Sequence, residues 1–304
     1  NYQMKLQQIL SSLQKLHPKE IDLSLDRIKK LCKKLGNPQD NLKYISVVGT
    51  NGKYSTIQAI RAILKDANIN CNVYTSPHIQ KINERYEYNN EKISDDKLSK
   101  LLLKVKEINN NDAITYFEIL TAAYFYEANK YKDNINIIEA GLFHRFDATN
   151  IIKSNLASIV TAIGLDHLDW LPKNEQTIEK IIFEKTSSLL TSKIIVSKQS
   201  SNEIIDKIKD SIKKNYSNQL IFGNDFNYSL NENGFFYYED RYGGLKLPLP
   251  NLEGEFQLSN VATAIATVRN IDEINVSDEN IKNGITKIKS IARFQEIKNG
   301  KLKD

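Results

Sequence analysis

The feature that most constrains the fold is a short apolar run that leads straight into a glycine loop. The run, residues 44–48, has the length and composition of a strand buried inside a sheet. The loop, Gly49-Thr50-Asn51-Gly52-Lys53, follows at once, and the apolar residues after it recur at helical spacing. A strand, a glycine loop and a helix in this order begin a parallel α/β unit.

The same alternation continues along the chain. Helices are predicted around residues 25–35, 94–108 and 117–131, and Gly36 and Pro38 end the first of them. Further strand candidates occupy residues 71–74, 135–140, 156–163 and 194–196. The pattern predicts the α/β class, with a mononucleotide-binding, mostly parallel sheet and helices on both faces.

After about residue 190 the composition changes. Residues 220–249 are rich in Tyr, Phe, Asn and Gly, with turn signals at residues 231–234 and at Gly243-Gly244. We therefore expect a small hairpin-rich β unit, bounded at about 194–250, at the edge of the domain. A further helix is predicted over residues 260–268.

Charge and cysteine usage narrow the class of protein. The net charge is +5, but the lysines alternate with Asp and Glu, which favours a solvated surface over a nucleic-acid footprint. No apolar run reaches the roughly 18 residues of a membrane helix, and the N-terminus has no signal pattern. Cys32 and Cys71 are isolated, as is usual in a reducing compartment. We expect a cytoplasmic monomer that binds neither nucleic acid nor membrane.

The glycine loop has the pattern of a shortened phosphate loop. Its glycines allow backbone N–H groups to approach phosphate oxygens, and the helix N-terminus adds a favourable partial charge. Lys53 would reach the terminal phosphates, and Ser55 would offer its hydroxyl to Mg²⁺. A plain turn is the alternative, but the position between a strand and a helix favours nucleotide binding. The expected contacts are Gly49, Thr50, Asn51, Gly52, Lys53, Tyr54, Ser55 and Thr56.

Several motifs in one order resemble the folylpolyglutamate synthase/dihydrofolate synthase family of the Mur ligase superfamily. The loop is similar to the Gly-Thr-Asn-Gly-Lys signature of these ligases, and residues 75–78 and 83–85 resemble their Thr-Ser-Pro-His and Glu-Arg segments. The similarity continues through residues 115–121, 139–150, 164–167, 184–185, 257–260 and 293–295. It implies an ATP-dependent ligase that adds L-glutamate to dihydropteroate, to folates or to both, through an acyl phosphate.

The resemblance also implies roles for single residues. Ser55 and Glu139 would bind a first Mg²⁺, and His167 would lie near a second; a purely structural His167 or Glu139 is the alternative. Lys185 matches a lysine that family members carbamylate, although a salt-bridged surface lysine would also fit. With Lys53 and His167, Lys185 forms the expected catalytic set. Asn260 would contact the adenine side of ATP and Arg293 its phosphates.

The substrate residues implied by the resemblance line the site of the pterin-bearing acid. They are Ser76, Pro77, His78, Phe117, Glu118, Arg145, Asp147 and Thr149. Phe117 fits a plain core position equally well, because aromatic side chains are often simply buried.

Three features depart from the family pattern. Tyr54 stands where folate ligases usually have Gly, and Phe143-His144 replaces a pair of glycines, which would alter the pocket. The chain also ends about where the family's C-terminal domain would start. We therefore expect residues 1–293 to form the ATP-binding domain and residues 294–304 to begin a linker. The family's C-terminal Rossmann-like domain is expected to be absent from this chain, which favours a fragment over a truncated protein.

Two alternatives to the folate reading remain. One is a Mur-type ligase that adds an amino acid to a UDP-muramoyl peptide, against which residues 75–78 and 147–150 argue. The other is a truncated, non-catalytic nucleotide-binding module. Retention of the candidate catalytic and metal residues together favours an enzyme.

Overall fold

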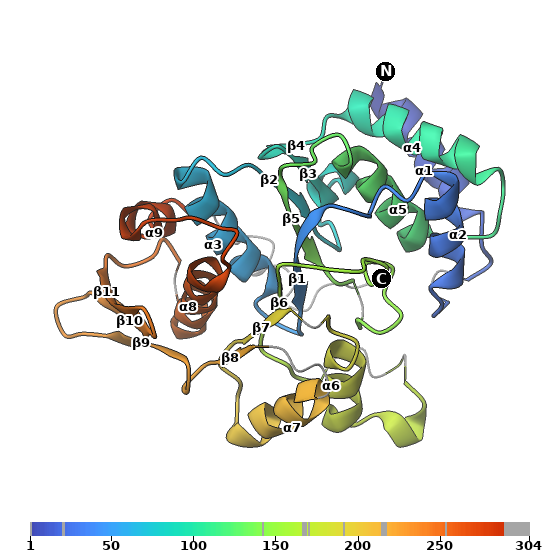
Figure 1. Ribbon diagram of the computed structural model, residues 1–304. Coiled ribbons are helices and arrows are strands. Elements are labelled where there is room, and N and C mark those ends of the chain that lie inside the picture. The colour runs from blue at the N-terminus through green and yellow to red at the C-terminus, as the bar shows by residue number, and fades with distance from the viewer. Residues whose placement is uncertain are drawn as a thin grey trace. The chain divides into compact units, whose positions relative to one another are not determined.

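The computed structural model contains two compact units, whose elements are labelled in Figure 1. Unit 1 comprises Asn1–Tyr44 and Cys71–Lys153, and unit 2 comprises Ile45–Asn70 and Ser154–Asp304. The structure describes residues 2–19, 22–141, 143–165, 169, 171–190, 192–213, 218–252 and 254–288.

Unit 1 contains a central parallel strand pair extended by a short hairpin. Strand β2 (Cys71–Tyr74) pairs in parallel with β5 (Ile135–Glu139), with Cys71 opposite Ile135. On its other side β2 pairs antiparallel with β3 (Tyr86–Tyr88), which pairs in turn with β4 (Glu91–Lys92). The short 3-10 helix η1 (Ile82–Arg85) precedes β3. The predicted strands at residues 71–74 and 135–140 are confirmed.

The helices of unit 1 pack on one another beside these strands. They are α1 (Tyr2–Gln14), α2 (Asp26–Lys34), α4 (Asp95–Asn109) and α5 (Tyr116–Ala128). Ser94 caps α4 by accepting the N–H of Lys97 at 3.3 Å. Thr115 and Glu118 form a capping box at the start of α5. The three helices predicted in this part of the chain are confirmed, with their ends shifted by up to three residues.

Unit 2 is built on parallel strands. Beyond its first two residues β1 (Lys43–Val48) belongs to this unit, and it pairs in parallel with β6 (Ala157–Val160). Next in order are β7 (Lys193–Val196) and β8 (Gln219–Ile221), both parallel as well. Residues 44–48 of β1 are all buried, as are all four of β6. Such continuous apolar runs are typical of strands covered on both faces.

The helices of unit 2 form two groups, which Figure 1 shows on either side of β6–β8. Helix α3 (Lys53–Asp66) packs against α8 (Glu255–Asn270) and α9 (Asp278–Ile285), while α6 (Ile178–Thr186) packs against α7 (Asn202–Ile212). A 3-10 helix, η3 (Lys173–Glu175), precedes α6. The backbones of α3 and α9 approach closely at Gly284, where a Cβ would lie 2.6 Å from the Ile63 Cα.

A separate antiparallel sheet confirms the predicted hairpin-rich unit. It consists of β9 (Phe226–Leu230), β10 (Phe236–Asp240) and β11 (Gly243–Leu247). The unit is smaller than expected, because β7 and β8 belong to the parallel strands. Gly243 and Gly244 begin β11, where they pair with Asp240 and Glu239, and residues 241–242 form the turn. The following helix starts at Glu255, earlier than expected, after Gly254 at φ 99°.

The α/β class, with mostly parallel strands, helices and a small antiparallel sheet, is therefore confirmed. Within the part of the chain that the structure describes, none of the helices combines the length and apolar character needed to cross a bilayer. Cys32 and Cys71 are both buried in unit 1.

Candidate functional site

The glycine loop of unit 2 adopts a backbone that requires its two glycines. Gly52 lies in the left-handed region at φ 88° and precedes the first turn of α3, so the helix N-terminus faces the loop. A Cβ at residue 52 would lie 2.4 Å from the Asn260 Oδ1, and one at Gly49 would lie 1.9 Å from the Thr161 Oγ1. Thr56 Oγ1 donates back to the Gly52 carbonyl at 2.7 Å. The loop and the first turn of α3 thus form as the sequence predicted.

Hydrogen bonds hold this loop against the end of β6. The N–H groups of Thr50 and Asn51 both donate to the Ala162 carbonyl at 3.0 Å. Thr50 Oγ1 donates to the Gly164 carbonyl at 3.2 Å and accepts the Gly164 N–H at 3.0 Å. These contacts fix the loop before any ligand binds.

Lys185 contacts the same loop from α6. Its Nζ donates to the Gly49 carbonyl at 3.2 Å, and the residue is only 1% exposed. Lysine is rarely buried to this degree without partners. The arrangement excludes the surface-lysine alternative and puts an amino group beside the phosphate loop.

A cavity of about 480 Å³ opens beside the loop within unit 2. Asn51 and Gly52 form one wall, residues 197–200 after β7 form another, and Asn260 with its neighbours at the start of α8 forms the third. Asn260 Nδ2 donates to Gln257 Oε1 at 3.0 Å, which leaves the Asn260 Oδ1 directed at Gly52. The predicted nucleotide residues Asn51, Gly52 and Asn260 therefore meet at one cavity.

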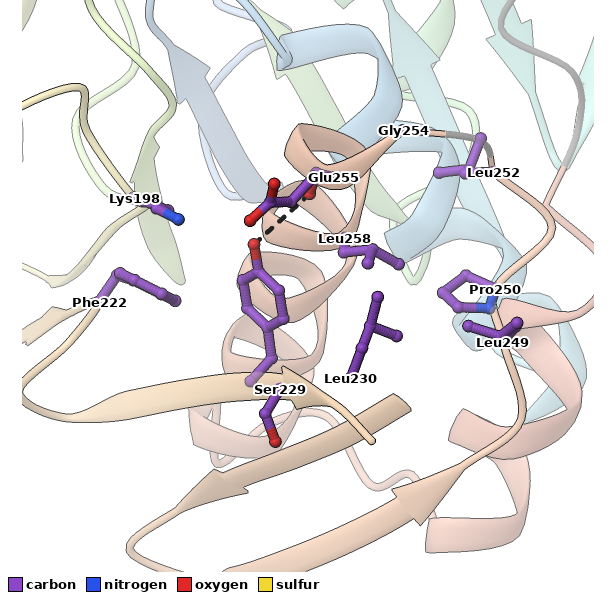
Figure 2. Close-up of a pocket in the computed structure, with 11 residues that line it drawn as sticks. Lys198, Phe222, Ser229, Leu230, Leu249, Pro250, Leu252, Gly254, Glu255 and Leu258 are labelled. Atoms are coloured by element: carbon purple, nitrogen blue, oxygen red, sulfur yellow. Dashed lines mark hydrogen bonds between the residues drawn. The ribbon is translucent and has the colours of Figure 1, made fainter. Parts of the chain in front are cut away.

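A second cavity of about 610 Å³ adjoins the first and shares Lys198, Tyr228 and Glu255 with it. Figure 2 shows Lys198 and Phe222 on one side of it and a group of apolar residues on the other. The apolar residues are Leu249, Pro250 and Leu252. The hydroxyl of Tyr228 donates to the Glu255 carbonyl at 3.4 Å. Unit 2 thus offers two adjoining cavities, of which the smaller lies beside the loop.

In unit 1, predicted residues gather where β2 and β5 end. The Ser76 N–H donates to the Glu139 carboxylate at 3.4 Å, and Glu139 is 3% exposed. Two residues on, Gly141 packs so tightly on Phe117 that a Cβ would lie 2.7 Å from its ring. The carboxyl ends of parallel strands are where α/β proteins place ligands.

Asp147 organises the chain beyond this cluster. Its carboxylate accepts the N–H of Gly141 at 2.9 Å, the N–H of Thr149 at 3.0 Å and the Thr149 hydroxyl. Arg145 lies over the ring of Phe146, 4.4 Å from its centroid. Direct contact with a substrate stays a prediction for Arg145, Asp147 and Thr149.

Glu118 stabilises the packing of two helices in unit 1, a role that was not predicted from the sequence. Its carboxylate accepts the Thr115 N–H at 2.9 Å within the capping box. It also forms a two-pronged ion pair with Arg27 of α2, at 2.8 and 3.1 Å. The side chain joins two helices of unit 1, and its predicted contact with the substrate stays untested.

Comparison with known proteins places these features in one family. The pattern of the Mur ligase middle domain matches residues 47–268. The dihydrofolate synthase/folylpolyglutamate synthase of Haemophilus influenzae is 31% identical over 99% of this chain and 67% of its own length. This chain belongs to the dihydrofolate synthase/folylpolyglutamate synthase family of Mur ligases.

Solved structures of such Mur ligases agree with the fold. The Escherichia coli FolC protein in complex with DHPP and ADP has a TM-score of 0.82 at 30% identity, covering 93% of this chain and 66% of its own. The bifunctional synthase of Yersinia pestis, complexed with AMPPNP and Mn ion, has a TM-score of 0.83 at 30% identity, over 95% and 68%. The chain spans about two thirds of the length of the Mur ligases it matches.

Ser55 and Glu139 are the expected metal ligands of a Mur ligase that lie among the described residues. Ser55 is fully buried, and its hydroxyl has no hydrogen-bond partner among the described residues, which fits a metal ligand. Glu139 supplies a buried carboxylate in unit 1, the type of ligand that Mg²⁺ prefers. His167 and Arg293 lie outside the described residues. The described part of the chain contains no group of three or more His, Cys, Asp or Glu that could hold a metal ion.

Two departures from the Mur ligase pattern, Tyr54 and the pair Phe143-His144, differ in how far their side chains are buried. Tyr54 is half-buried in the first turn of α3, where helical geometry does not require glycine. Phe143 and His144 are both buried, at 4% and 5% exposure. Burial lowers the pKa of His144 to about 4, so this ring is neutral at pH 7.

Residues 197–200 line the cavity of this Mur ligase chain, but they were not predicted as site residues from the sequence. Gln199 Nε2 donates to the carbonyls of Thr161 and Ser197 at 3.1 and 3.0 Å, and its Oε1 accepts the Ile163 N–H at 2.8 Å. A signal was present, because this segment follows the carboxyl end of a predicted parallel strand.

Proposed function

We propose that this chain carries the nucleotide-binding part of an ATP-dependent ligase that joins L-glutamate to dihydropteroate, to folates or to both. The observation that carries the proposal is the 31% identity over 99% of the chain to a dihydrofolate synthase/folylpolyglutamate synthase. The phosphate loop beside the cavity supports it independently. Related structures in complex with ADP, or with AMPPNP and Mn ion, support ATP and a divalent metal as its ligands.

The reaction has two steps. An oxygen of the substrate carboxylate attacks the γ-phosphorus of ATP, which gives an acyl phosphate and releases ADP. The amino group of glutamate then attacks the acyl carbon, loses a proton and expels phosphate, which leaves an amide. Both steps depend on positioning and on neutralising oxygen charge. Lys53 and the N–H groups at the start of α3 would hold the phosphates, since the N–H groups of Thr50 and Asn51 donate to the Ala162 carbonyl.

Ser55, Glu139 and His167 would hold Mg²⁺, and we expect two ions in total. Bound there, Mg²⁺ supplies neutralisation of the phosphate charge. Lys185 is our candidate for a carbamate, because its amino group is buried beside the loop and a carbamate would turn a cation into an anionic ligand. Asn260 would contact the adenine side, and Arg293 the phosphates.

The test measures ADP release by the protein expressed from its complete gene. We expect release that requires both glutamate and either dihydropteroate or a tetrahydrofolate. ADP release that requires a UDP-muramoyl substrate instead would replace the folate assignment. ATP binding without turnover on either class of acceptor would favour a non-catalytic module.

We also propose that the protein works as a cytoplasmic monomer. The support is its mixed surface charge together with two buried cysteines. Light scattering during gel filtration should give the mass of one chain, and a concentration-independent dimer mass would contradict this. Fluorescent tagging of the full-length gene product in its own cell should give diffuse cytoplasmic signal.

A further inference from the structure

The segment between β2 and β3 is organised around one carboxylate. Glu84 accepts the backbone N–H groups of three successive residues: Ile79 at 2.9 Å, Gln80 at 3.1 Å and Lys81 at 2.9 Å. Hydrogen bonds to an ionised acceptor are stronger than those between neutral groups. One side chain therefore fixes the backbone of residues 79–81.

Burial opposes the charge of Glu84, but the three backbone N–H groups outweigh it and lower the pKa of this carboxyl. Glu84 is consequently ionised at neutral pH. The segment it holds keeps this anchor under the conditions in which the protein works.

Hydrogen bonds also join the two ends of the same segment. The Thr75 N–H donates to the Arg85 carbonyl at 3.1 Å, and the Thr75 hydroxyl donates to the Glu84 carbonyl at 3.2 Å. Arg85 Nε donates to His78 Nδ1 at 2.9 Å. Nδ1 of His78 therefore serves as the acceptor that holds this ring against Arg85.

The segment lies at the edge of the sheet where unit 1 gathers its candidate residues. Thr75 and Ser76 leave the carboxyl end of β2, and the Ser76 N–H donates to Glu139 at the end of β5. Pro77 is exposed and His78 half-buried. Residues 76–78 thus lie at the edge of the sheet where α/β proteins place their ligands.

We propose that Glu84 is a positioning residue for the acid substrate of the ligase. It holds residues 76–81 in the shape in which Ser76 and His78 meet the pterin-bearing acid, and it acts through the backbone without touching that substrate. Arg85 completes the arrangement by holding the His78 ring through Nδ1. This inference rests on the proposed function.

The test compares Glu84→Gln with the wild type in the protein expressed from its complete gene. Glutamine keeps the size of the side chain but turns an N–H₂ group toward N–H donors. We expect the KM for dihydropteroate to rise about tenfold, as for a lost hydrogen bond to a charged group, with kcat within about twofold and the KM for ATP unchanged. Amide hydrogen exchange at residues 79–81 should accelerate by about tenfold or more. Glu91→Gln, an exposed carboxylate of β4, is the matched control and should change neither.

The outcomes separate the two proposals. Wild-type ADP release without any need for dihydropteroate or a folate overturns the proposed function, and this inference with it. Normal wild-type turnover together with an unchanged KM or unchanged exchange in Glu84→Gln overturns the inference alone. A lower kcat at unchanged KM does the same. Should Glu84→Gln not fold, Arg85→Lys removes the Nε contact to His78, leaves Glu84 in place and carries the same kinetic test.

Discussion

At the scale of single residues, Gly52 joins backbone geometry to nucleotide binding. A methyl group there meets both a positive φ and the Asn260 side chain, whereas Gly36 has a similar φ of 86° with nothing within 4 Å of a Cβ. We predict that Gly36→Ala costs only about 1 kcal/mol in free energy of unfolding. Gly52→Ala should cost more and weaken ATP binding by at least about tenfold. Urea unfolding and ATP titration of both variants would check this, and equal effects of the two substitutions would contradict it.

His144 predicts a dependence of stability on pH. Its pKa is lowered to about 4 in the folded chain, so between that value and about 6.5 only the unfolded chain binds the proton. Stability from this group is therefore complete above about pH 6.5 and is lost as the pH falls. Between pH 7 and pH 5 the wild type should lose about 2 kcal/mol more free energy of unfolding than His144→Gln. The prediction would be refuted if urea unfolding gave the same change in free energy of unfolding between the two pH values for both proteins.

Lys185 gives a prediction about chemistry. If its amino group carries a carbamate, Lys185→Ala should lower the ligation rate about 100-fold or more. Short carboxylic acids such as acetate should restore part of the rate by supplying the missing anion. Lys180→Ala on the same helix is the control, because Lys180 pairs with Glu184 at 3.3 Å and has no part in the proposal. A Lys185→Ala protein that is folded and as active as the wild type would leave the lysine without a catalytic role.

At the scale of elements, α2 and α5 are joined by the pair of Arg27 and Glu118. The side chains are 19% and 5% exposed. The loss of Arg27 leaves the Glu118 charge with little access to water, and the loss of Glu118 leaves Arg27 with its second carboxylate partner, Asp22 at 3.1 Å. Glu118→Ala should cost about 3 kcal/mol in free energy of unfolding. The double variant Arg27→Ala/Glu118→Ala should cost less than the sum of the single ones by about 1 kcal/mol or more. Additive costs in urea unfolding would mean that the pair does not couple the helices.

The elements themselves could largely be predicted from the sequence. Residues 71–74 contain Val73 and Tyr74, which favour strands, and β2 has the same bounds. Ser94 and Gly36 mark helix ends through local capping and φ preferences, which act within a few residues. The ion pair of Glu118 could not be predicted, because its partner Arg27 lies 91 residues away in the sequence and only the packed fold brings the two together.

At the scale of the whole chain, ligand binding should be visible as stability. A ligand that binds only the folded state at 100 times its Kd adds about 2.7 kcal/mol to the free energy of unfolding. We predict that ATP with Mg²⁺ raises the melting temperature by several degrees and that Lys53→Ala abolishes the shift while the fold is kept. Lys282→Ala, an exposed lysine of α9, should keep the full shift. A normal shift in Lys53→Ala would exclude the phosphate-loop role.

The cavities mark the limit of what the sequence could predict at this scale. The walls of the smaller cavity come mainly from residues 51–52, 197–200 and 255–260, which are far apart in the chain. They meet because β1, β6 and β7 run side by side in parallel, so that their following loops share one edge. Strand order is a property of the packed molecule, and motifs alone identified only the first and last of these segments.

The amide of Gln199 has a consequence for how this protein can drift in evolution. Its one N–H₂ group satisfies two carbonyls, and its oxygen satisfies one N–H, so every atom of the group is used. Glutamate differs by a single atom, yet when ionised it would point negative oxygen at the carbonyls, and when protonated it would offer one hydrogen where two are needed. Neither form of the nearest chemical neighbour replaces the amide, so a mutation at this site must be accompanied by rebuilding of the strand ends around it.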